Sequence, residues 1–415
     1  MSNVGIVGAG VGGLHLGILL QRRGVDVTVY ADRSGDQLAK GRLLNAVMHH
    51  HLTLSREADL GLSLWNADEH GWRHRYQDIT GDREVRYSAI SPGPSMAVDY
   101  RLYLPALMAA FEQLGGRLIV RQVQVDEVDG VAAAHDLLVV ATGRDSMQSL
   151  FPVRTDLGRP PGVRRNICAA LVHGIRRPDP EGVTLGFARG VGELIEFPMV
   201  TAQGRQTALL FEAVPGGPAD ELATSSPTED GQAFEKKLLE TLQHYPATHE
   251  RVDTSSFALL GPRDVLRGAI APAVRHGAAY LPSGKVALAL GDAHVLVDPV
   301  MGQGANIASY SAHVVGEAIL EDLAFDELFC RQVAEKREPL LHAAYDWTNL
   351  VLDSPGRLLQ LHEAAAAEPA IAADFASRYP RPDLIWRTVA TDQRVNQYLR
   401  SFDVEASSGT NGERS

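Results

Sequence analysis

Apolar and polar residues follow two different periodicities along this chain, and each predicts a different part of the fold. Residues 4–30 contain a short apolar run, a helical segment that carries Leu16, Leu19 and Leu20, and a second apolar run. A strand, a helix and a strand in this order form a βαβ unit, whose strands lie parallel in one sheet. Two later apolar runs, 136–141 and 286–290, have the character of strands buried on both faces. We therefore expect these distant segments to meet in a single parallel sheet.

The stretch between these runs predicts a second sheet. Short β-type runs, separated by turn signals, occupy residues 167–173, 183–187, 194–200 and 206–214. Their pattern indicates an antiparallel or mixed sheet that is inserted as a second domain. From about Ala305 to about Phe402 the apolar residues recur at helical spacing. The residues from about Glu405 onward are polar and rich in Ser and Gly, so we expect a disordered tail.

Composition and charge narrow the class of protein. Charged residues make up 22% of the 415 residues and the formal net charge is −12, which argues against a nucleic-acid or anionic-membrane surface. The two cysteines, Cys168 and Cys330, cannot build a disulfide framework, so a reducing cytoplasm fits. We see no signal peptide, and no apolar run reaches the ~18 residues that span a bilayer. We expect a cytoplasmic globular protein.

A glycine-rich turn directly follows the first predicted strand. Gly8, Gly10 and Gly13 fit the pattern G-x-G-x-x-G and open the first predicted helix. In this pattern the first glycine permits a tight turn, the second lets the backbone approach a pyrophosphate, and the third lets helix and strand pack closely. The helix N-terminus offers N–H groups and partial positive charge to the phosphates. The agreement of strand, turn and helix favours a dinucleotide site over a glycine turn without a ligand.

The acidic residue that usually ends the second strand and holds the adenosine ribose is displaced in this chain. Its expected position holds Ala31, and Asp32 follows one residue later. Asp32 either serves with a shift of one residue or leaves the ribose weakly held. We therefore expect modest affinity for the dinucleotide.

A second glycine-bearing segment lies near residue 300. Gly291 and Asp292 follow the predicted strand at 286–290, where the Asp292 carboxylate can accept hydrogen bonds from ribityl hydroxyls. Gly302 and Gly304 let the backbone pass close to a flat ring, and the helix after them points its positive end at the pyrimidine edge of that ring. The two glycine motifs together resemble the FAD hydroxylase superfamily typified by p-hydroxybenzoate hydroxylase, which favours FAD over NAD.

These patterns predict an α/β fold with a Rossmann-like FAD-binding domain on a parallel sheet, an inserted substrate-binding domain on a mixed or antiparallel sheet, and C-terminal helices. The predicted boundaries are 1–60, 95–150 and 280–325 for the discontinuous FAD-binding domain, 61–94 and 151–279 for the substrate-binding domain, 326–403 for the helical region, and 404–415 for the disordered tail.

Five further segments carry a more specific resemblance. They read R-L-L-N-x-V-x-H at 42–49, P-S-x-A-V-D-Y-R-L-Y at 94–103, G-E-L-I-E at 192–196, D-P-x-x-G-Q-G-A-N at 298–306 and W-T-N at 347–349. Together they resemble the oxygenase (epoxidase) component of two-component styrene and indole monooxygenases, and the likeness runs from about residue 3 to about residue 400.

The resemblance implies an FAD-dependent epoxidase that receives reduced FAD from an NADH-dependent flavin reductase. With O2 the reduced flavin forms a C4a-hydroperoxide, whose distal oxygen is transferred to the vinyl group of a small aryl alkene such as styrene, or to the 2,3 double bond of indole. The family also suggests a homodimer.

The candidate site residues rest on the motifs and on this resemblance. Asn45 is the catalytic candidate, because its amide can hydrogen-bond the flavin or the peroxide without being an acid strong enough to break the intermediate down; the alternative is a turn or cap role. The styrene-type pattern also includes Val47, His49 and Ser95, and we expect these residues to bind substrate, with Val300 and Met301. The cofactor candidates are Gly8, Gly10, Gly13, Asp32, Arg42, Arg101, Gly143, Asp292, Pro299, Gly302, Gly304 and Asn306.

The chain departs from related patterns at two places. Single-component hydroxylases carry Asp-Gly after the strand at 136–141, whereas this chain has Ala141, Thr142 and Gly143, and no second G-x-G-x-x-G offers a site for a nicotinamide. This absence suggests that reduced FAD comes from a separate reductase. Styrene-type relatives tend to have Tyr and His around residues 72–75, where this chain has Trp72 and Arg75, so the pattern leaves the natural substrate open.

Other reactive side chains have simpler interpretations. Three consecutive histidines, 49–51, point in different directions and make a poor chelate, so we expect no metal. Glu196 and Glu212 could form a pair of carboxylates, but we expect them to be charges on a sheet surface. We expect Cys168 to be a small buried apolar residue and not a nucleophile. Arg42 and Arg101 could equally be surface residues. Oxygen transfer to an alkene requires exclusion of water and a held substrate, which predicts an apolar pocket between the flavin and the inserted sheet and no catalytic triad.

Three other functions share parts of this pattern. A one-component NAD(P)H-dependent aromatic hydroxylase is disfavoured by the altered Asp-Gly motif. A flavin-dependent halogenase is disfavoured because the chain lacks W-x-W-x-I-P. A GDP-dissociation-inhibitor-like binding protein, which does no redox chemistry, is disfavoured by intact Gly8, Gly10, Gly13 and Asp292.

Overall fold

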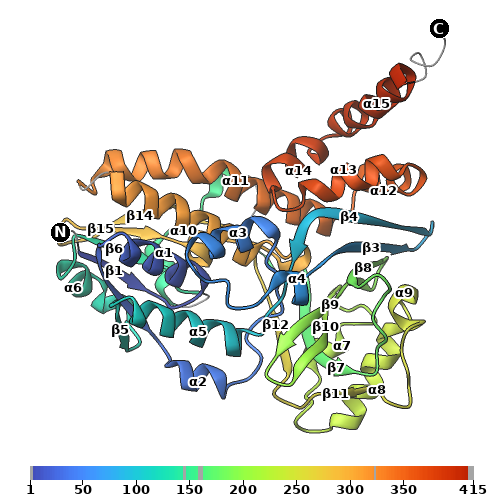
Figure 1. Ribbon diagram of the computed structural model, residues 1–415, viewed down its shortest axis with the longest axis horizontal. Coiled ribbons are helices and arrows are strands. Elements are labelled where there is room, and N and C mark those ends of the chain that lie inside the picture. Colours follow the sequence, from blue (N-terminus) through green and yellow to red (C-terminus); the bar gives the residue numbers. More distant parts are fainter. Residues whose placement is uncertain (1–2, 144–145, 158–161, 322–323, 410–415) are drawn as a thin grey trace.

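The first sheet contains six strands in the order β14-β15-β6-β1-β2-β5 (Figure 1). It includes β1 and β2, the two strands of the predicted βαβ unit. This computed structural model describes residues 3–143, 146–157, 162–321 and 324–409. The strands are β1 (Asn3–Val7), β2 (Asp26–Ala31), β5 (Arg117–Val120), β6 (Leu137–Val140), β14 (Ala278–Tyr280) and β15 (Val286–Ala289). All neighbours pair in parallel except β14 and β15. The expectation that the runs at 136–141 and 286–290 join the first strand in one sheet is confirmed.

The continuous apolar character of these strands has a simple cause, because helices cover both faces of the sheet. On β6, Leu137 and Val139 pack with α1 (Val11–Arg22), α5 (Tyr100–Gln113) and α10 (Gly304–Glu321). Leu138 and Val140 point the other way and pack with α6 (Val128–Ala133) and the short helix Ser146–Leu150. Alternate residues of one strand therefore belong to two different cores.

The second sheet contains eight strands and is mixed, as predicted. Its main order is β11-β7-β10-β9-β8-β3-β4, with β12 also paired to β7. The strands are β3 (Trp72–Thr80), β4 (Val85–Ser95), β7 (Asn166–His173), β8 (Gly182–Ala188), β9 (Gly192–Thr201), β10 (Gly204–Ala213), β11 (Ala258–Leu259) and β12 (Val265–Ala269). The β3–β8 pair is parallel and the other pairs are antiparallel.

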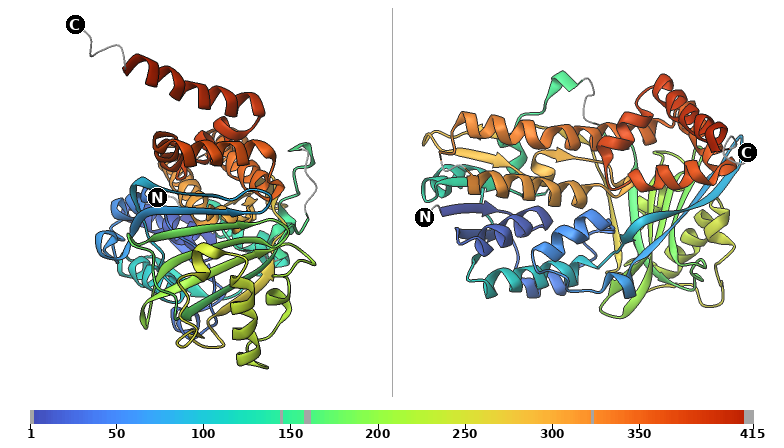
Figure 2. Two further views of the ribbon diagram at one scale, coloured as in Figure 1. Left: turned by 90° about the vertical axis from the view of Figure 1, so that its right-hand side faces the viewer. Right: turned by 45° about the horizontal axis from the view of Figure 1, so that its top comes forward.

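This second sheet is also covered on both faces (Figure 2). On one face, residues such as Leu171, Phe197 and Leu210 pack with the C-terminal helices. On the other face, residues such as Cys168 and Phe211 pack with α8 (Gly231–Leu242), α7 (Glu221–Thr224) and α9 (Pro246–His249) lying nearby. A short antiparallel pair is formed by β13 (Ala273–Val274) and β16 (Val295–Leu296). Strand β13 lies between β12 of the second sheet and β14 of the first sheet in sequence.

The C-terminal part is helical from Gly304 onward, which confirms the predicted pattern. After α10 come α11 (Glu327–Asp353), α12 (Gly356–Ala367), α13 (Pro369–Arg378), α14 (Pro382–Val389) and α15 (Asp392–Gly409). Helix α15 stands away from the body of the molecule (Figure 1). The expectation of a disordered tail over 404–415 is wrong for residues 404–409, because α15 continues through them. Residues 410–415 lie outside the described residues.

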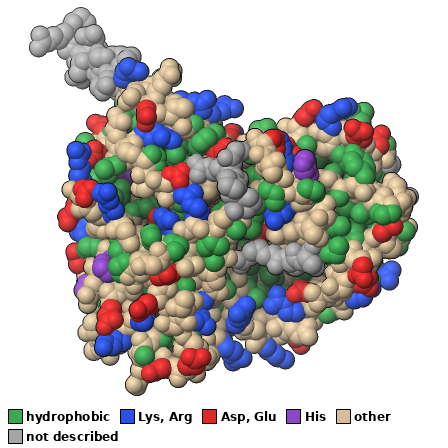
Figure 3. Space-filling model, turned by 180° about the vertical axis from the view of Figure 1, so that it is seen from behind, with side chains coloured by type: hydrophobic (Ala, Val, Ile, Leu, Met, Phe, Trp, Pro, Cys, Tyr) green, Lys and Arg blue, Asp and Glu red, His purple; other side chains and the backbone are tan. Residues whose placement is uncertain are grey.

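The remaining helices lie before the second sheet and are short: α2 (Gly35–Ala39), α3 (His51–Asp59) and α4 (Ala67–His70). No helix in the described part of the chain combines the length and the hydrophobicity needed to cross a bilayer. Figure 3 shows acidic and basic side chains interspersed over the back of the molecule, with hydrophobic side chains between them.

Candidate active site

The N-terminal glycine turn has the geometry that a pyrophosphate requires. Gly8 has φ +114°, and a Cβ there would lie 2.5 Å from the Ala141 carbonyl oxygen. A Cβ at Gly13 would lie 2.0 Å from the Gly8 carbonyl oxygen, whereas one at Gly10 would meet nothing within 4 Å. Gly8 and Gly13 therefore allow strand and helix to touch, and Gly10 faces open space. No side chain caps α1 and its first turn carries no acidic residue, so an anion fits there.

A hollow of about 380 Å³ extends from this turn past the end of β2. Gly8, Gly10 and Asp32 line it. Because β2 ends at Ala31, the first carboxylate after the strand belongs to Asp32, whose side chain is 59% exposed and forms an ion pair with Arg33 at 3.0 Å. The shift of one residue thus leaves the carboxylate beside the hollow but largely in solvent.

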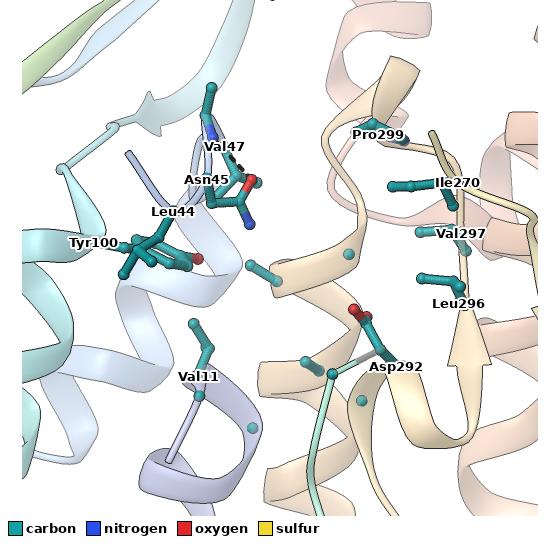
Figure 4. Close-up of a pocket in the computed structure, with 18 of the residues that line it drawn as sticks. Val11, Leu44, Asn45, Val47, Tyr100, Ile270, Asp292, Leu296, Val297 and Pro299 are labelled. Carbon is teal, nitrogen blue, oxygen red and sulfur yellow. Dashed lines mark hydrogen bonds between the residues drawn. The ribbon is translucent and has the colours of Figure 1, made fainter. Parts of the chain in front are cut away.

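A second cavity of about 260 Å³ lies next to this hollow at the N-terminus of α1, and Figure 4 shows residues that line it. Both spaces are lined by Gly10, Ala141, Thr142 and Gly143. The second glycine segment forms the opposite wall, and its predicted residues that line the cavity are Asp292, Pro299, Gly302 and Gly304. The two glycine motifs, distant in sequence, therefore border the same cavity, and the hollow beside it adds the length that a dinucleotide with a flat ring needs.

The walls of this cavity are mostly apolar, and they come from segments next to the first sheet and from the second sheet. Leu44 and Val47 contribute from the segment before α3, Ile167 and Leu210 from the second sheet, and Ile270 from the loop after β12. Among the described lining residues, the formally charged ones are Asp292 and Arg267. The predicted apolar pocket between the flavin segments and the inserted sheet is thus present.

Asn45 presents a hydrogen-bond donor to the cavity. Its Oδ1 accepts a hydrogen bond from the backbone N–H of Ala46 at 2.8 Å. Because that backbone group can only donate, the amide orientation is fixed and the Nδ2 hydrogens point into the cavity, as Figure 4 shows. Asn45 therefore offers a neutral donor that does not release its proton at ordinary pH.

The segment before α10 is held by its own polar contacts. The Val300 N–H donates to Asp298 Oδ1 at 3.1 Å, and Gly302 adopts φ +64°. Asn306 Nδ2 donates to the carbonyl oxygens of Gly302, at 2.7 Å, and Met48, at 3.0 Å. Asn306 is buried and joins two segments that line the cavity, so it supports the site rather than lining the cavity itself.

His49 and Ser95, two of the predicted substrate contacts, are not among the described residues that line the cavity. His49 Nδ1 lies 2.6 Å from Glu57 Oε1 and its Nε2 lies 3.0 Å from the hydroxyl of Tyr100. Tyr100 is the group that faces the cavity. The Ser95 hydroxyl lies 3.0 Å from His50 Nδ1. His49 and Ser95 both sit one layer behind the wall, because the chain turns them toward buried polar partners.

Glu57 is the centre of this buried network. It also accepts a hydrogen bond from the hydroxyl of Tyr103 at 2.7 Å, and Tyr103 lies 2.8 Å from His15 Nε2. Burial on its own would raise the pKa of Glu57, but the charge interaction and hydrogen bond with His49 outweigh it and lower that pKa. Glu57 therefore stays ionised and fixes the orientation of His49 behind Tyr100.

The two predicted arginines are not in the cavity wall. Arg42 is exposed. Arg101 forms ion pairs with Asp99 and Asp264, each at 2.6 Å, and so connects the start of α5 to the segment before β12. Both arginines are absent from the cavity lining in the described chain. Asp99 belongs to the same motif as Arg101, but Asp264 lies far away in the sequence, so the motif alone does not show this second ion pair.

The remaining substrate candidates border a small void next to the main cavity. Val300 and Met301 line this void, and Val47 lines both spaces. Gly13 is a packing glycine, as described above, and touches neither space. Tyr100 was not singled out from the sequence, although it stands between the quoted Asp99 and Arg101.

The expectation that Glu196 and Glu212 are surface charges is wrong. Glu212 has no exposed surface, and burial raises the pKa of its carboxyl well above the ordinary value. Glu196 is 3% exposed and forms an ion pair with Arg251. Their strands lie inside a sheet that helices cover on both faces, so neither residue has a solvent side. Cys168 is buried, as predicted.

Two solved structures with this fold belong to flavin enzymes. A flavin-dependent brominase, Bmp2, superposes with a TM-score of 0.66 at 15% identity over 96% of this chain and 99% of its own. PqsL from Pseudomonas aeruginosa, a probable FAD-dependent monooxygenase, gives a TM-score of 0.63 at 17% identity over 88% of this chain and 99% of its own. The chain thus has a fold that these flavin-dependent enzymes share.

Sequence relatives give the family. Residues 143–251 match the family model described as "Styrene monooxygenase A putative substrate binding domain". Styrene monooxygenases StyA from Pseudomonas fluorescens and from another Pseudomonas are each 36% identical over 405 residues, covering 96% of this chain and 98% of theirs. The chain therefore belongs to the styrene monooxygenase family, and it is a flavin-dependent monooxygenase with FAD as its cofactor.

Proposed function

We propose that this protein epoxidises a small aryl alkene, with styrene as the model substrate and indole as the alternative. The observation that carries the proposal is the single space bordered by both glycine motifs and closed by apolar side chains of the second sheet. Such a space holds a flavin and an uncharged aromatic molecule side by side. The 36% identical relatives are named styrene monooxygenases, which agrees with that substrate class.

The described residues fit FAD along the length of this space. Gly8, Gly10 and the N-terminus of α1 would hold the pyrophosphate, and Asp32 the adenosine ribose. Asp292 would hold the ribityl chain, and the segment Pro299–Met301 with Gly302 would lie against the ring. Helix α10 begins at Gly304 on the cavity wall and would direct its positive end toward the pyrimidine edge. Reduced FAD, when bound there, supplies the activation of O2.

The chain's own residues supply binding, orientation and a dry environment. The Asn45 amide would donate a hydrogen bond beside the reacting oxygen, and its neutrality avoids proton transfer at that point. Leu44, Val47 and Leu210 would hold the aryl group and exclude water. This division of labour requires no catalytic triad.

We further infer that reduced FAD comes from a separate NADH-dependent reductase. The Ala141–Thr142–Gly143 segment stands where single-component hydroxylases have Asp-Gly. The exposed Asp32 carboxylate offers a solvent-screened contact to the ribose, which suits a flavin that is exchanged rather than permanently held. A homodimer is also proposed from the family, and light scattering of the purified protein would test it.

The function is tested by mixing the purified protein with FAD, a generic flavin reductase, NADH and either styrene or indole. We expect styrene oxide or blue indigo, and we expect no NADH oxidation when the reductase is left out. Lys236→Ala, at an exposed position on α8 away from the cavity, serves as the control and should retain full activity. Rapid NADH oxidation without the reductase would instead support a one-component hydroxylase.

A further inference from the structure

Arg75 is a buried guanidinium without an acidic partner. The residue lies on β3 and is 4% exposed. Its Nε donates to the hydroxyl of Ser91 at 3.2 Å, and its guanidinium carbon lies 4.0 Å from the ring centre of Tyr379. Within the described chain, Arg75 forms no ion pair, whereas other largely buried arginines such as Arg165 and Arg251 are paired with carboxylates. A buried charge without an opposite charge is costly, so such a residue is a candidate for function.

The guanidinium borders the small void next to the main cavity. The void has a volume of about 10 Å³ and is also lined by Phe197, Met301 and Tyr379. It shares Val47, Leu210 and Pro299 with the main cavity. A space of this size accommodates about one oxygen-sized atom. An aryl group held in the main cavity can therefore extend one small substituent toward Arg75.

Apart from the Nε–H that donates to Ser91, the guanidinium of Arg75 donates no hydrogen bond to the described residues. Tyr379 presents its ring face, and Tyr87, His50 and His51 also interact electrostatically with Arg75. The pKa of His50 is lowered well below its usual value, first by burial and then by the charge of Arg75, so His50 is neutral. The opposite end of the void is apolar, with Phe197 and Leu210.

We propose that Arg75 selects aryl alkenes that carry an oxygen substituent on the ring, in the simplest case a phenolic hydroxyl. The inference rests on the function proposed above and narrows its substrate class. The guanidinium donates hydrogen bonds to the ring oxygen, which occupies the void, while the vinyl group stays in the main cavity beside the flavin. Met301, a flexible side chain on the wall of the void, adjusts to the exact position of the substituent. The reaction itself is unchanged, and the substituent is not consumed.

The test compares substrates of equal size. Hydroxystyrene and methylstyrene, each as the 3- and 4-isomer, differ in a single group of similar volume that is a hydrogen-bond acceptor in one and apolar in the other. We expect the wild-type protein to show kcat/KM at least about tenfold higher for one hydroxystyrene isomer than for the matching methylstyrene. Arg75→Met, which keeps most of the side-chain volume, should abolish or reverse that ratio. Arg75→Lys, which keeps the charge but not the planar fork, should restore part of it.

A binding measurement separates this inference from the proposed function. The protein with oxidised FAD, without reductant, is titrated with the same alkenes by calorimetry, and the hydroxystyrene is expected to bind about tenfold more tightly in an Arg75-dependent way. If this preference is present but no alkene is epoxidised, Arg75 binds the ring oxygen and the proposed reaction is wrong. If styrene and methylstyrene are epoxidised and bound as well as hydroxystyrene, Arg75 only stacks on Tyr379 and the inference is overturned. The wild-type comparison decides the matter even if both variants fold poorly.

Discussion

Replacing Glu57 with Gln tests whether the buried network behind Tyr100 holds the cavity wall in place. Glu57 is 4% exposed and accepts hydrogen bonds from both His49, at 2.6 Å, and Tyr103, at 2.7 Å. Both hydrogen bonds go to the same oxygen, Oε1, so a neutral amide keeps the size of the side chain and an acceptor there but loses the charge. Breaking a buried charged contact of this kind costs about 3 kcal/mol.

The pH dependence of that loss follows from the pKa of Glu57. This pKa is lowered in the folded protein from its usual 4.5. The contribution of the ionised carboxylate to stability is therefore complete above the unfolded value, and it is lost as the pH falls through the lower folded value. We expect the difference between wild type and Glu57→Gln to be constant from pH 8 to pH 6 and to shrink below about pH 4.5.

The assay is urea unfolding of the two proteins, with Asp59→Asn as the matched control. Asp59 is an exposed acid on the same helix, α3, and its neutralisation should change the free energy of unfolding by about 0.5 kcal/mol or less. Tyr100 faces the cavity and is in hydrogen-bond contact with His49, which Glu57 holds in place. The Glu57→Gln variant should therefore also bind FAD more weakly. Equal losses for the two variants, or a Glu57→Gln loss that grows as the solution is acidified, would refute the reasoning.

Three further predictions concern the glycine turn, the cavity and acid stability. Gly13→Ala should abolish FAD binding, measured by fluorescence titration, because its Cβ would lie 2.0 Å from the Gly8 carbonyl oxygen, whereas Gly130→Ala in α6, where nothing lies within 4 Å, should bind FAD normally. Asn45→Asp places a carboxylate where an amide donor faces the cavity, so the yield of epoxide per NADH should fall at least about tenfold and hydrogen peroxide should rise, with product and peroxide assays as the readout. Burial lowers the pKa of His15 and of His294 from 6.5 to about 4, so the stability that each contributes is complete above pH 6.5 and is lost on acidification. Each of these two histidines should lower the free energy of unfolding by about 2 kcal/mol between pH 7 and pH 5, measured by urea unfolding. A free energy that does not change with pH would contradict the burial of these rings.

Local chemistry in the sequence was enough for much of the fold and for half of the site. The turn at Gly8 and the turn at Gly302 need backbone angles that glycine adopts readily, so their pattern is visible in the sequence. Strands buried on both faces, such as β6, need unbroken apolar runs, and these runs are also visible in the sequence. Asn45 and Asp292 lie beside these local features, and both line the cavity.

Tertiary structure alone decided what the other residues face. His49 and Asn45 are four residues apart in one motif, yet one is turned toward Glu57 and the other toward the cavity. Arg75 lies between half-buried neighbours on β3, and it is buried because β3 pairs in parallel with β8 and Tyr379, at the end of α13, packs onto the guanidinium. Burial of a polar side chain depends on which distant element covers it, and no periodicity in the residue's own segment carries that information.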